Sequence, residues 1–326
     1  MSAGLSLHRC CPVCADNQAT PCLSKATLRL VRCRRCAMVY ADPVPSEFVS
    51  GAYYDAVGDT YYLSAAKLES DYSPVRFERE LRLFRRYCPR GRVLDVGCSS
   101  GAFLFQLRSR APGAYDILGT DVSGPALDYA EARGIPVRRG DFLQMDFAGA
   151  PFDAITFWAV LEHLAQPRLF LEKAATLLKP EGLCLVLVPN FQSLAVRLLG
   201  SKYRYIYDQH LNYFTRSTLR QLAQPRFRLL AAHSTHFNPV VIWQDWRSGG
   251  RPVSNPQRAE LLRRTTAWKQ NPLLAPARFL YRWVESVLGV AFLADNLLFV
   301  LQPLSQSQMA AEPSVPGPEA RLKKGD

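Results

Sequence analysis

Short apolar runs alternate with amphipathic segments through the middle of the chain. Such runs are typical of buried strands, and segments with apolar residues three or four positions apart are typical of helices. The predicted strands cover residues 92–97, 115–123, 135–142, 152–160 and 183–190, and the predicted helices cover 102–110, 124–134 and 166–182. Strands that alternate with helices predict an α/β fold, a doubly wound parallel sheet covered on both faces.

The regions around this core differ in character. Residues 1–42 are polar and rich in cysteine, and residues 43–88 are rich in tyrosine and predicted to form a helical lid or linker. The main domain is predicted over 89–303, with two more strands at 227–237 and 295–303 and a helical insertion at about 240–293. The tail, 304–326, is rich in Pro, Ser and Ala and is predicted to be disordered.

Composition restricts the class of protein. Hydrophobic residues make up 48% of the chain and charged residues 21%, which is usual for a soluble globular protein. We find neither an apolar run long enough to span a membrane nor the apolar stretch of a signal peptide at the N-terminus. These features predict a cytoplasmic, reducing location, where the nine cysteines would not form a disulfide framework.

The net charge of +12 is unevenly spread, and most of the excess follows residue 197. It fits an ordinary solvated basic surface, and it equally fits a phosphate-bearing or lipid-linked small-molecule acceptor or an anionic membrane. The sequence contains no run of five or more consecutive basic residues, so it does not indicate a nucleic-acid-binding tail. The segment 272–293 is interpreted as a helix packed over the pocket, with peripheral membrane contact through Tyr281 and Trp283 as the alternative.

Polar residues follow the predicted strands at their carboxyl ends, where parallel sheets bind ligands. Gly97 permits a sharp turn and the close approach of a ligand, and Asp121 is placed to accept both hydroxyls of a ribose. Asp141 can accept a hydrogen bond from an adenine amine, and Phe142 can stack on the ring. Together they predict an adenosine site. The whole set comprises Asp95, Gly97, Gly101, Asp121, Asp141, Phe142, Trp158, Glu162, His163, Pro189 and Asn190.

The glycine turn argues against a nicotinamide dinucleotide. The fingerprint G-x-G-x-x-G/A requires glycine at position 99, where this chain has Ser99. The carboxylate of Asp95 beside the turn would repel a pyrophosphate, whereas it suits a ligand with an amino group or a sulfonium.

At these residues the chain resembles the class I S-adenosylmethionine-dependent methyltransferases. The resemblance rests on "LDVGCSSG", "GTDVS", "GDF", "FDAITFWAVLEHL", "LLKPEGLCLVLVPN" and "HLNYFT", over roughly residues 75–238. The branch it resembles most contains ubiquinone-biosynthesis-type and sugar- or antibiotic-tailoring enzymes.

This resemblance implies a Rossmann-like sheet of seven strands, with the last strand antiparallel between the fifth and sixth. It also implies that S-adenosyl-L-methionine is the cofactor. Asp95, Gly97 and Gly101 would line its methionine part, Asp121 its ribose, and Asp141 with Phe142 its adenine. Val122 and Trp158 complete the predicted cofactor site. The family usually has glycine where Ser99 stands, and we expect a tighter loop rather than lost binding.

Two cysteine pairs predict a metal site. Cys11 and Cys14, then Cys33 and Cys36, form two C-x-x-C knuckles with eighteen residues between them. This spacing predicts a four-cysteine structural zinc ribbon. The ribbon could bind RNA or a protein or brace the substrate pocket, and the resemblance favours the bracing role because related methyltransferases carry a similar ribbon.

Methyl transfer is an in-line displacement, so the enzyme mainly positions the reactants and excludes water. A base helps when the acceptor is a hydroxyl or an acidic carbon. The candidates are His163 and His210, with Glu162 orienting His163 or contacting the substrate. Tyr54 and Tyr62 are predicted to cover the methyl sulfonium from the lid.

The sequence therefore predicts an enzyme that methylates a small molecule, most readily an oxygen of a sugar-containing or other secondary metabolite. The alternatives are C-methylation of a nucleotide sugar, RNA modification with the ribbon gripping RNA, and a binding module without catalysis. The segment "FWAVLEHL" lacks the Asn/Asp-Pro-Pro-Tyr/Phe motif of base N-methylation. The acids Asp95, Asp121 and Asp141 argue against an inactive module.

Overall fold

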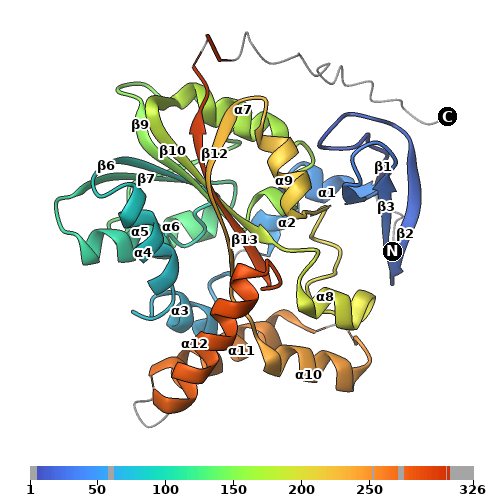
Figure 1. Ribbon diagram of the computed structural model, residues 1–326. Helices are drawn as coiled ribbons and strands as arrows, with labels where there is room; N and C mark the ends of the chain where they lie inside the picture. The colour runs from blue at the N-terminus through green and yellow to red at the C-terminus, as the bar shows by residue number, and fades with distance from the viewer. Residues whose placement is uncertain (1–5, 58–61, 252, 271–274, 306, 309–326) are drawn as a thin grey trace.

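A seven-stranded sheet forms the centre of the computed structural model (Figure 1). The structure describes residues 6–57, 62–251, 253–270, 275–305 and 307–308. The strand order is β12-β13-β10-β9-β6-β7-β8, and β13 runs antiparallel to both neighbours while the other pairs are parallel. The predicted fold class is therefore confirmed. The strands are β6 Gly91–Val96, β7 Tyr115–Asp121, β8 Val137–Arg139, β9 Phe152–Trp158, β10 Leu178–Pro189, β12 Phe227–Thr235 and β13 Asn296–Pro303.

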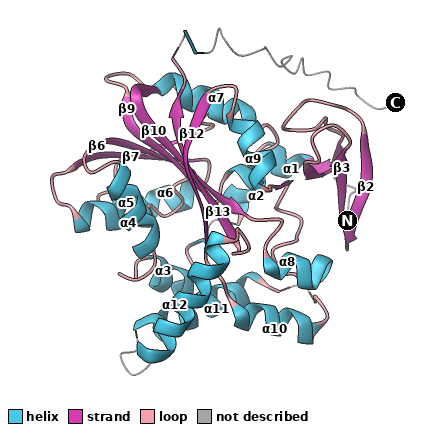
Figure 2. Ribbon diagram, in the orientation of Figure 1, coloured by secondary structure: helices cyan, strands magenta, loops and turns pink. Residues whose placement is uncertain are grey.

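Helices cover both faces of this sheet (Figure 2). One apolar cluster joins it to α4 and α5, and the other joins it to α7 and α9. Successive strand residues point to opposite faces, so in β6 Val93 belongs to the first cluster and Leu94 to the second. The helices that cover the two faces are α4 Glu78–Tyr87, α5 Ala102–Arg110, α6 Gly124–Ala132, α7 Pro167–Leu177 and α9 Arg216–Ala223.

The strand register brings the predicted site residues to one edge of the sheet. Asp95 at the end of β6 lies opposite Thr156 of β9, and Trp158 of β9 lies opposite Leu187 of β10. Asp121 ends the neighbouring strand β7. Because all of these strands are parallel, their carboxyl ends meet along one edge and open a site there.

A second, four-stranded sheet contains the N-terminal cysteine region. Its order is β11-β4-β3-β2, with β2 Ala19–Lys25, β3 Leu28–Cys33, β4 Val39–Ala41 and β11 Asn212–Tyr213. The last of these strands comes from a later part of the chain, where Asn212 pairs with Tyr40 and Tyr213 with Val39. A two-stranded pairing of β1 Ser6–Leu7 with β5 Val44–Pro45 completes the region. The N-terminal sheet is thus finished by a distant segment.

Arg9 joins the N-terminal region to two loops at the edge of the large sheet. Its guanidinium donates to the backbone oxygens of Ala165 at 3.0 Å and Leu211 at 2.6 Å, and to Oδ1 of Asn212 at 2.8 Å. Its Nε donates to the oxygen of Ala41 at 3.0 Å. A single cation therefore ties β4 to the segments on either side of the site.

The segment before β6 and the insertion before β13 lie against each other beside this edge (Figure 1). Ser70 of α3 bonds Thr266 of α11 at 2.9 Å, and Gln270 donates to Ser73 at 2.9 Å. The helices are α1 Ser46–Val49, α2 Ala52–Ala56, α3 Ala65–Asp71, α8 Leu194–Leu199, α10 Pro239–Ser248, α11 Asn255–Gln270 and α12 Ala275–Val290, with short 3₁₀ turns at Leu161–His163 and Gly200–Lys202.

Within the described part of the predicted insertion, the chain forms the helices α10, α11 and α12. Among the described residues, none of the helices combines the length and apolar character needed to cross a bilayer. Most of the predicted tail, 304–326, falls outside the described residues.

Candidate functional site

A cavity of about 540 Å³ opens at the carboxyl edge of the large sheet. Its walls come from the strand ends, from the segment before β6, and from the helical insertion. Most predicted site residues line it: Asp95, Gly97, Asp121, Val122, Asp141, Phe142, Trp158, Glu162, His163, His210, Tyr54 and Tyr62. Gly101 is outside the lining and precedes α5 as its left-handed N-cap residue. The sequence thus identifies most of one cavity from segments far apart in the chain.

Asp95 is buried at the floor of the cavity. Thr156 donates a hydrogen bond of 2.6 Å to its Oδ1. Burial raises the pKa of Asp95 to about 7, the Thr156 bond opposes the rise, and the charge of Asp121 adds to it. A cation bound here would favour the charged form of both carboxylates, because an opposite charge lowers the pKa of a nearby acid.

The turn after β6 is shaped for a close backbone approach. Gly97 has φ +74°, and a Cβ there would lie 2.6 Å from Cγ2 of Val160. Ser99 has φ +50°, in the left-handed region that glycine adopts more readily. Its N–H donates to Oδ2 of Asp121 at 2.8 Å, and the N–H of Ser123 donates to Oδ1 at 3.0 Å. Serine at 99 therefore takes the backbone conformation of a glycine and orients Asp121.

Several buried polar atoms on this side of the cavity have no partner among the described residues. They are Oγ1 of Thr120, Oγ of Ser123 and Nε1 of Trp158. Buried polar groups are normally hydrogen-bonded, so unpaired ones that line a cavity indicate a polar ligand. With the two acids, this donor and acceptor set fits a cofactor that has hydroxyls and a positive charge.

The predicted adenine residues are placed differently from each other. Asp141 is exposed and accepts the N–H of Leu143 at 2.9 Å through Oδ1. Phe142 is buried and stacks on Phe170, with ring centroids 5.5 Å apart. Phe142 thus belongs to the core and presents only part of its surface to the cavity.

Glu162, His163 and His210 meet on the opposite side of the cavity. One candidate ligand atom from each residue lies within 4.8 Å of the others. Among the described residues, neither carboxylate oxygen of Glu162 has a hydrogen-bond partner. Nδ1 of His210 has no such partner there either. The rings of His163 and His210 are 4.8 Å apart. The fold thus brings together the three predicted catalytic candidates, which come from two distant segments.

The protonation of His163 follows from its neighbours. Its Nδ1 lies 2.8 Å from the oxygen of Gln209 and 3.0 Å from the hydroxyl of Tyr54. Because a carbonyl oxygen only accepts, the bond to Gln209 requires the proton on Nδ1, which leaves the lone pair on Nε2. Burial lowers the pKa of His163 to about 4. The ring is therefore neutral at physiological pH, with Nε2 free of a proton.

The other two members of this cluster are also buried in their neutral forms. Burial raises the pKa of Glu162 to about 8. Burial lowers the pKa of His210 well below its usual value, and His163 lowers it further. Buried titratable groups with pKa values displaced in opposite directions are typical of acid–base sites.

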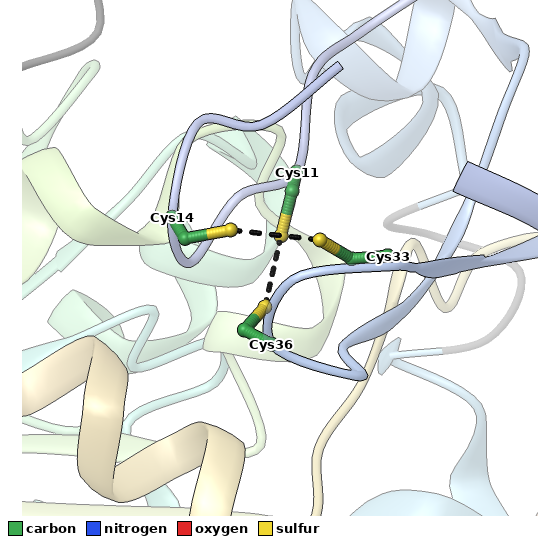
Figure 3. A group of neighbouring side chains, drawn as sticks. All are labelled: Cys11, Cys14, Cys33 and Cys36. Carbon is green, nitrogen blue, oxygen red and sulfur yellow. Dashed lines mark hydrogen bonds between the residues drawn. The ribbon is translucent and has the colours of Figure 1, made fainter. Parts of the chain in front are cut away.

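The four predicted metal-binding cysteines also meet (Figure 3). The Sγ atoms of Cys11 and Cys36 are 3.4 Å apart, those of Cys14 and Cys33 are 3.5 Å apart, and all four lie within 4.8 Å of one another. Tetrahedral zinc with Zn–S bonds of about 2.3 Å would separate the sulfurs by about 3.8 Å. Geometry and donor type thus fit a closed four-thiolate site. Cys10 and Cys22 are exposed and outside it.

Comparison with known proteins agrees with this geometry. Residues 74–226 match a family model described as a methyltransferase domain. This part of the chain is thus similar to known methyltransferase domains. It contains the turn, the acids and the Glu162–His163 pair described above.

The relatives match this domain in part. A ubiquinone biosynthesis O-methyltransferase of Azorhizobium caulinodans is 31% identical over 34% of this chain and 46% of its own length. A demethylmenaquinone methyltransferase of Deinococcus radiodurans is 33% identical over 37% and 51%. The chain thus spans about half the length of these curated relatives. The N-methyltransferase NodS of Bradyrhizobium japonicum, solved with S-adenosyl-L-homocysteine, is 16% identical over 77% of this chain and 98% of its own, with a TM-score of 0.46.

Sequence patterns did not identify several residues that shape the candidate site. Thr156, Gln209 and Arg9 contact the site or its loops only through the tertiary fold. Arg258, in the insertion, lines the cavity but belongs to no motif recognised in the sequence. These residues could be found only once the strand register and the path of the insertion were known.

Proposed function

We propose that this protein transfers the methyl group of S-adenosyl-L-methionine to an oxygen of a small metabolite. The observation that carries the proposal is the pairing, within one cavity, of Asp95 and Asp121 at the glycine turn with the Glu162–His163–His210 cluster on the opposite wall. When bound, S-adenosyl-L-methionine supplies a methyl carbon already activated by its sulfonium.

The residues at the glycine turn suit this cofactor. Asp95 and Asp121 favour a ligand that brings positive charge, as the ammonium and sulfonium of S-adenosyl-L-methionine do. The carboxylate of Asp121, held by two backbone N–H groups, is placed to accept the ribose hydroxyls. Gly97, Gly101, Val122, Asp141, Phe142 and Trp158 remain the proposed contacts of the rest of the cofactor.

The opposite wall suits an acceptor hydroxyl. Neutral His163 can take its proton on Nε2, because Nδ1 is occupied by Gln209. The partnerless carboxyl of Glu162 and the ring of His210 lie within reach to orient the acceptor or stabilise the resulting imidazolium. Residues of α3 and α11 line the same cavity, and by limiting the access of water they would keep the hydroxyl oriented for in-line attack.

O-methylation is supported by the relatives that are named as ubiquinone biosynthesis O-methyltransferases. A sugar-containing or other secondary metabolite is the acceptor class we propose, and C-methylation of a nucleotide sugar is the alternative that the same base would serve. RNA modification predicts retention of RNA that weakens steeply with salt, and such retention would favour that reading instead.

We also propose that the four cysteines hold a structural Zn²⁺ ion. All four positions would be filled by protein, so the ion would stabilise the fold rather than bind the acceptor. Thiolates must stay reduced to bind zinc, which supports the proposed cytoplasmic location.

Peripheral membrane contact through α12 is a further proposal. The inner side of this helix is fixed by Tyr281, which bonds the oxygen of Phe237, and by Glu285, which pairs with Arg79 at 2.9 Å. Its outer side leaves large apolar side chains half or more exposed: Phe279, Leu280, Trp283, Val287 and Val290. Aromatic and aliphatic side chains on one helix face suit a bilayer interface.

The first experiment is calorimetric titration of the zinc-loaded protein with S-adenosyl-L-methionine, with NAD as a comparison ligand. We expect binding of S-adenosyl-L-methionine alone and its loss in Asp121→Ala. Asp128→Ala is the matched control, because Asp128 is an exposed acid on the neighbouring helix α6. Binding of NAD, or equal binding by both variants, would contradict the proposal.

A further inference from the structure

Arg258 is a cation on the wall of the cavity. It belongs to α11, the insertion helix that packs on α3, and it is half-buried. Its guanidinium carbon lies 3.9 Å from the centroid of the Tyr207 ring. Nη2 makes one long hydrogen bond, 3.4 Å, to the backbone oxygen of Arg204. Stacking on Tyr207 fixes the plane of the guanidinium while leaving its donors largely unused.

The other cations around the cavity have carboxylate partners. Arg76 and Lys67 both pair with Asp71, and Arg204 pairs with Asp245 at 2.7 Å. Within the described residues, Arg258 forms no ion pair, and its Nε is buried without a hydrogen-bond partner. A guanidinium remains charged at every physiological pH, and shielding it from water without an anion is costly. The site is therefore arranged for an anion that the protein itself does not supply.

Arg258 lies close enough to the Glu162–His163–His210 cluster to influence its protonation. After burial, which is the larger cause, its charge contributes to lowering the pKa values of both His163 and His210. Leu261, Leu262 and Thr265, which follow on the same helix, also line the cavity. An anion held by Arg258 would thus lie on the acceptor side of the cavity, within electrostatic range of the acid–base cluster and separate from the acids at the glycine turn.

We propose that the methyl acceptor carries an anionic group, a phosphate or a carboxylate, and that Arg258 binds it. The inference rests on the proposed function in naming the acceptor of that reaction. The planar fork of a guanidinium matches either group through two parallel hydrogen bonds, which a lysine ammonium does not reproduce. With its anionic group held at Arg258, the length of the acceptor would determine how close its reacting hydroxyl lies to His163.

The test measures binding of simple anions to the zinc-loaded protein saturated with S-adenosyl-L-methionine. The probes are inorganic phosphate, uridine diphosphate and malonate, with uridine as the neutral comparison and ionic strength held constant. We expect at least one anion to bind and uridine to bind more weakly. A response to phosphate and uridine diphosphate alone assigns a phosphorylated acceptor, and a response to malonate alone assigns a carboxylate.

Two variants and a control decide the role of Arg258. Arg258→Gln is expected to weaken anion binding about tenfold or more, and Arg258→Lys by less, as the loss of charge-assisted bonds predicts. Arg264→Gln, on the same helix but exposed and paired with Glu260 at 2.8 Å, should leave it unchanged. Failure of all anions to bind, or equal binding by wild type and Arg258→Gln, overturns the inference. Failure of S-adenosyl-L-methionine to bind the wild type would instead overturn the proposed function.

Discussion

Replacing Arg9 tests whether the cysteine-rich region braces the site. Arg9→Met keeps much of the side-chain volume but removes the donors to Ala165, Leu211 and Asn212. The oxygen of Leu211 keeps the N–H of Ala41 at 2.9 Å, so the loss falls on the acceptors of Ala165 and Asn212, at about 1–3 kcal/mol for each acceptor left without a partner. Burial lowers the pKa of Arg9 to about 10, so the variant also regains the energy of desolvating that cation. We therefore expect a net loss of about 3 kcal/mol in the free energy of unfolding.

The measurement is urea denaturation of the zinc-loaded protein, followed by circular dichroism. Arg29→Met is the matched control, because Arg29 lies exposed on β3 of the same small sheet, and surface substitutions usually change stability by less than about 0.5 kcal/mol. Binding of S-adenosyl-L-methionine should persist in both variants, since Arg9 contacts no residue of the glycine turn. A loss below about 1 kcal/mol for Arg9→Met, or equal losses in the two variants, would refute the bracing argument.

Three further outcomes are expected. Burial raises the pKa of Glu162 to about 8, so the folded state holds this proton more tightly and stability falls as pH rises from about 4 to 8. Glu162→Gln should therefore exceed wild type in urea stability by about 1 kcal/mol or more near pH 8 but not near pH 5, and equal pH slopes would show that Glu162 is not buried in its neutral form. Ser99→Gly should keep cofactor binding and raise the free energy of unfolding by up to about 1 kcal/mol, because φ is +50° there; a marked fall in thermal stability would assign the hydroxyl a structural role. Phe279→Ser with Trp283→Ser should abolish co-sedimentation with anionic vesicles without changing cofactor affinity, and unchanged sedimentation would exclude α12 as the contact.

The central sheet was predictable because each of its strands can be recognised from a few consecutive residues. Most of its parallel strands are apolar runs with a polar residue at the carboxyl end, and parallel pairing necessarily brings those ends together. Asp95, Asp121 and His163 were found in this way, although they are separated by up to 68 residues. The two cysteine knuckles were equally readable, because metal ligation requires a fixed short spacing within each pair.

The remaining contacts depend on tertiary geometry that no spacing encodes. Arg9 looks like any surface arginine in the sequence, yet it bonds two loops more than 150 positions away. Phe142 was expected at the cofactor and lines the cavity, but no spacing in the sequence predicts that its ring also stacks on Phe170 in the core. Arg258 lies in the insertion, where apolar spacing predicts a helix but not which face it turns to the cavity.

The antiparallel pairing of β4 with β11 has a consequence for how the molecule is made. The two strands are separated by about 170 residues, so a nascent chain exposes β4 as an open edge until Asn212 and Tyr213 have been synthesised. Unprotected edges invite pairing with other chains, and closing so long a loop is entropically costly. The cysteine-rich segment is therefore not a detachable module. A counterpart grafted from another protein could bring its metal, but it would lack the matching strand that completes its sheet.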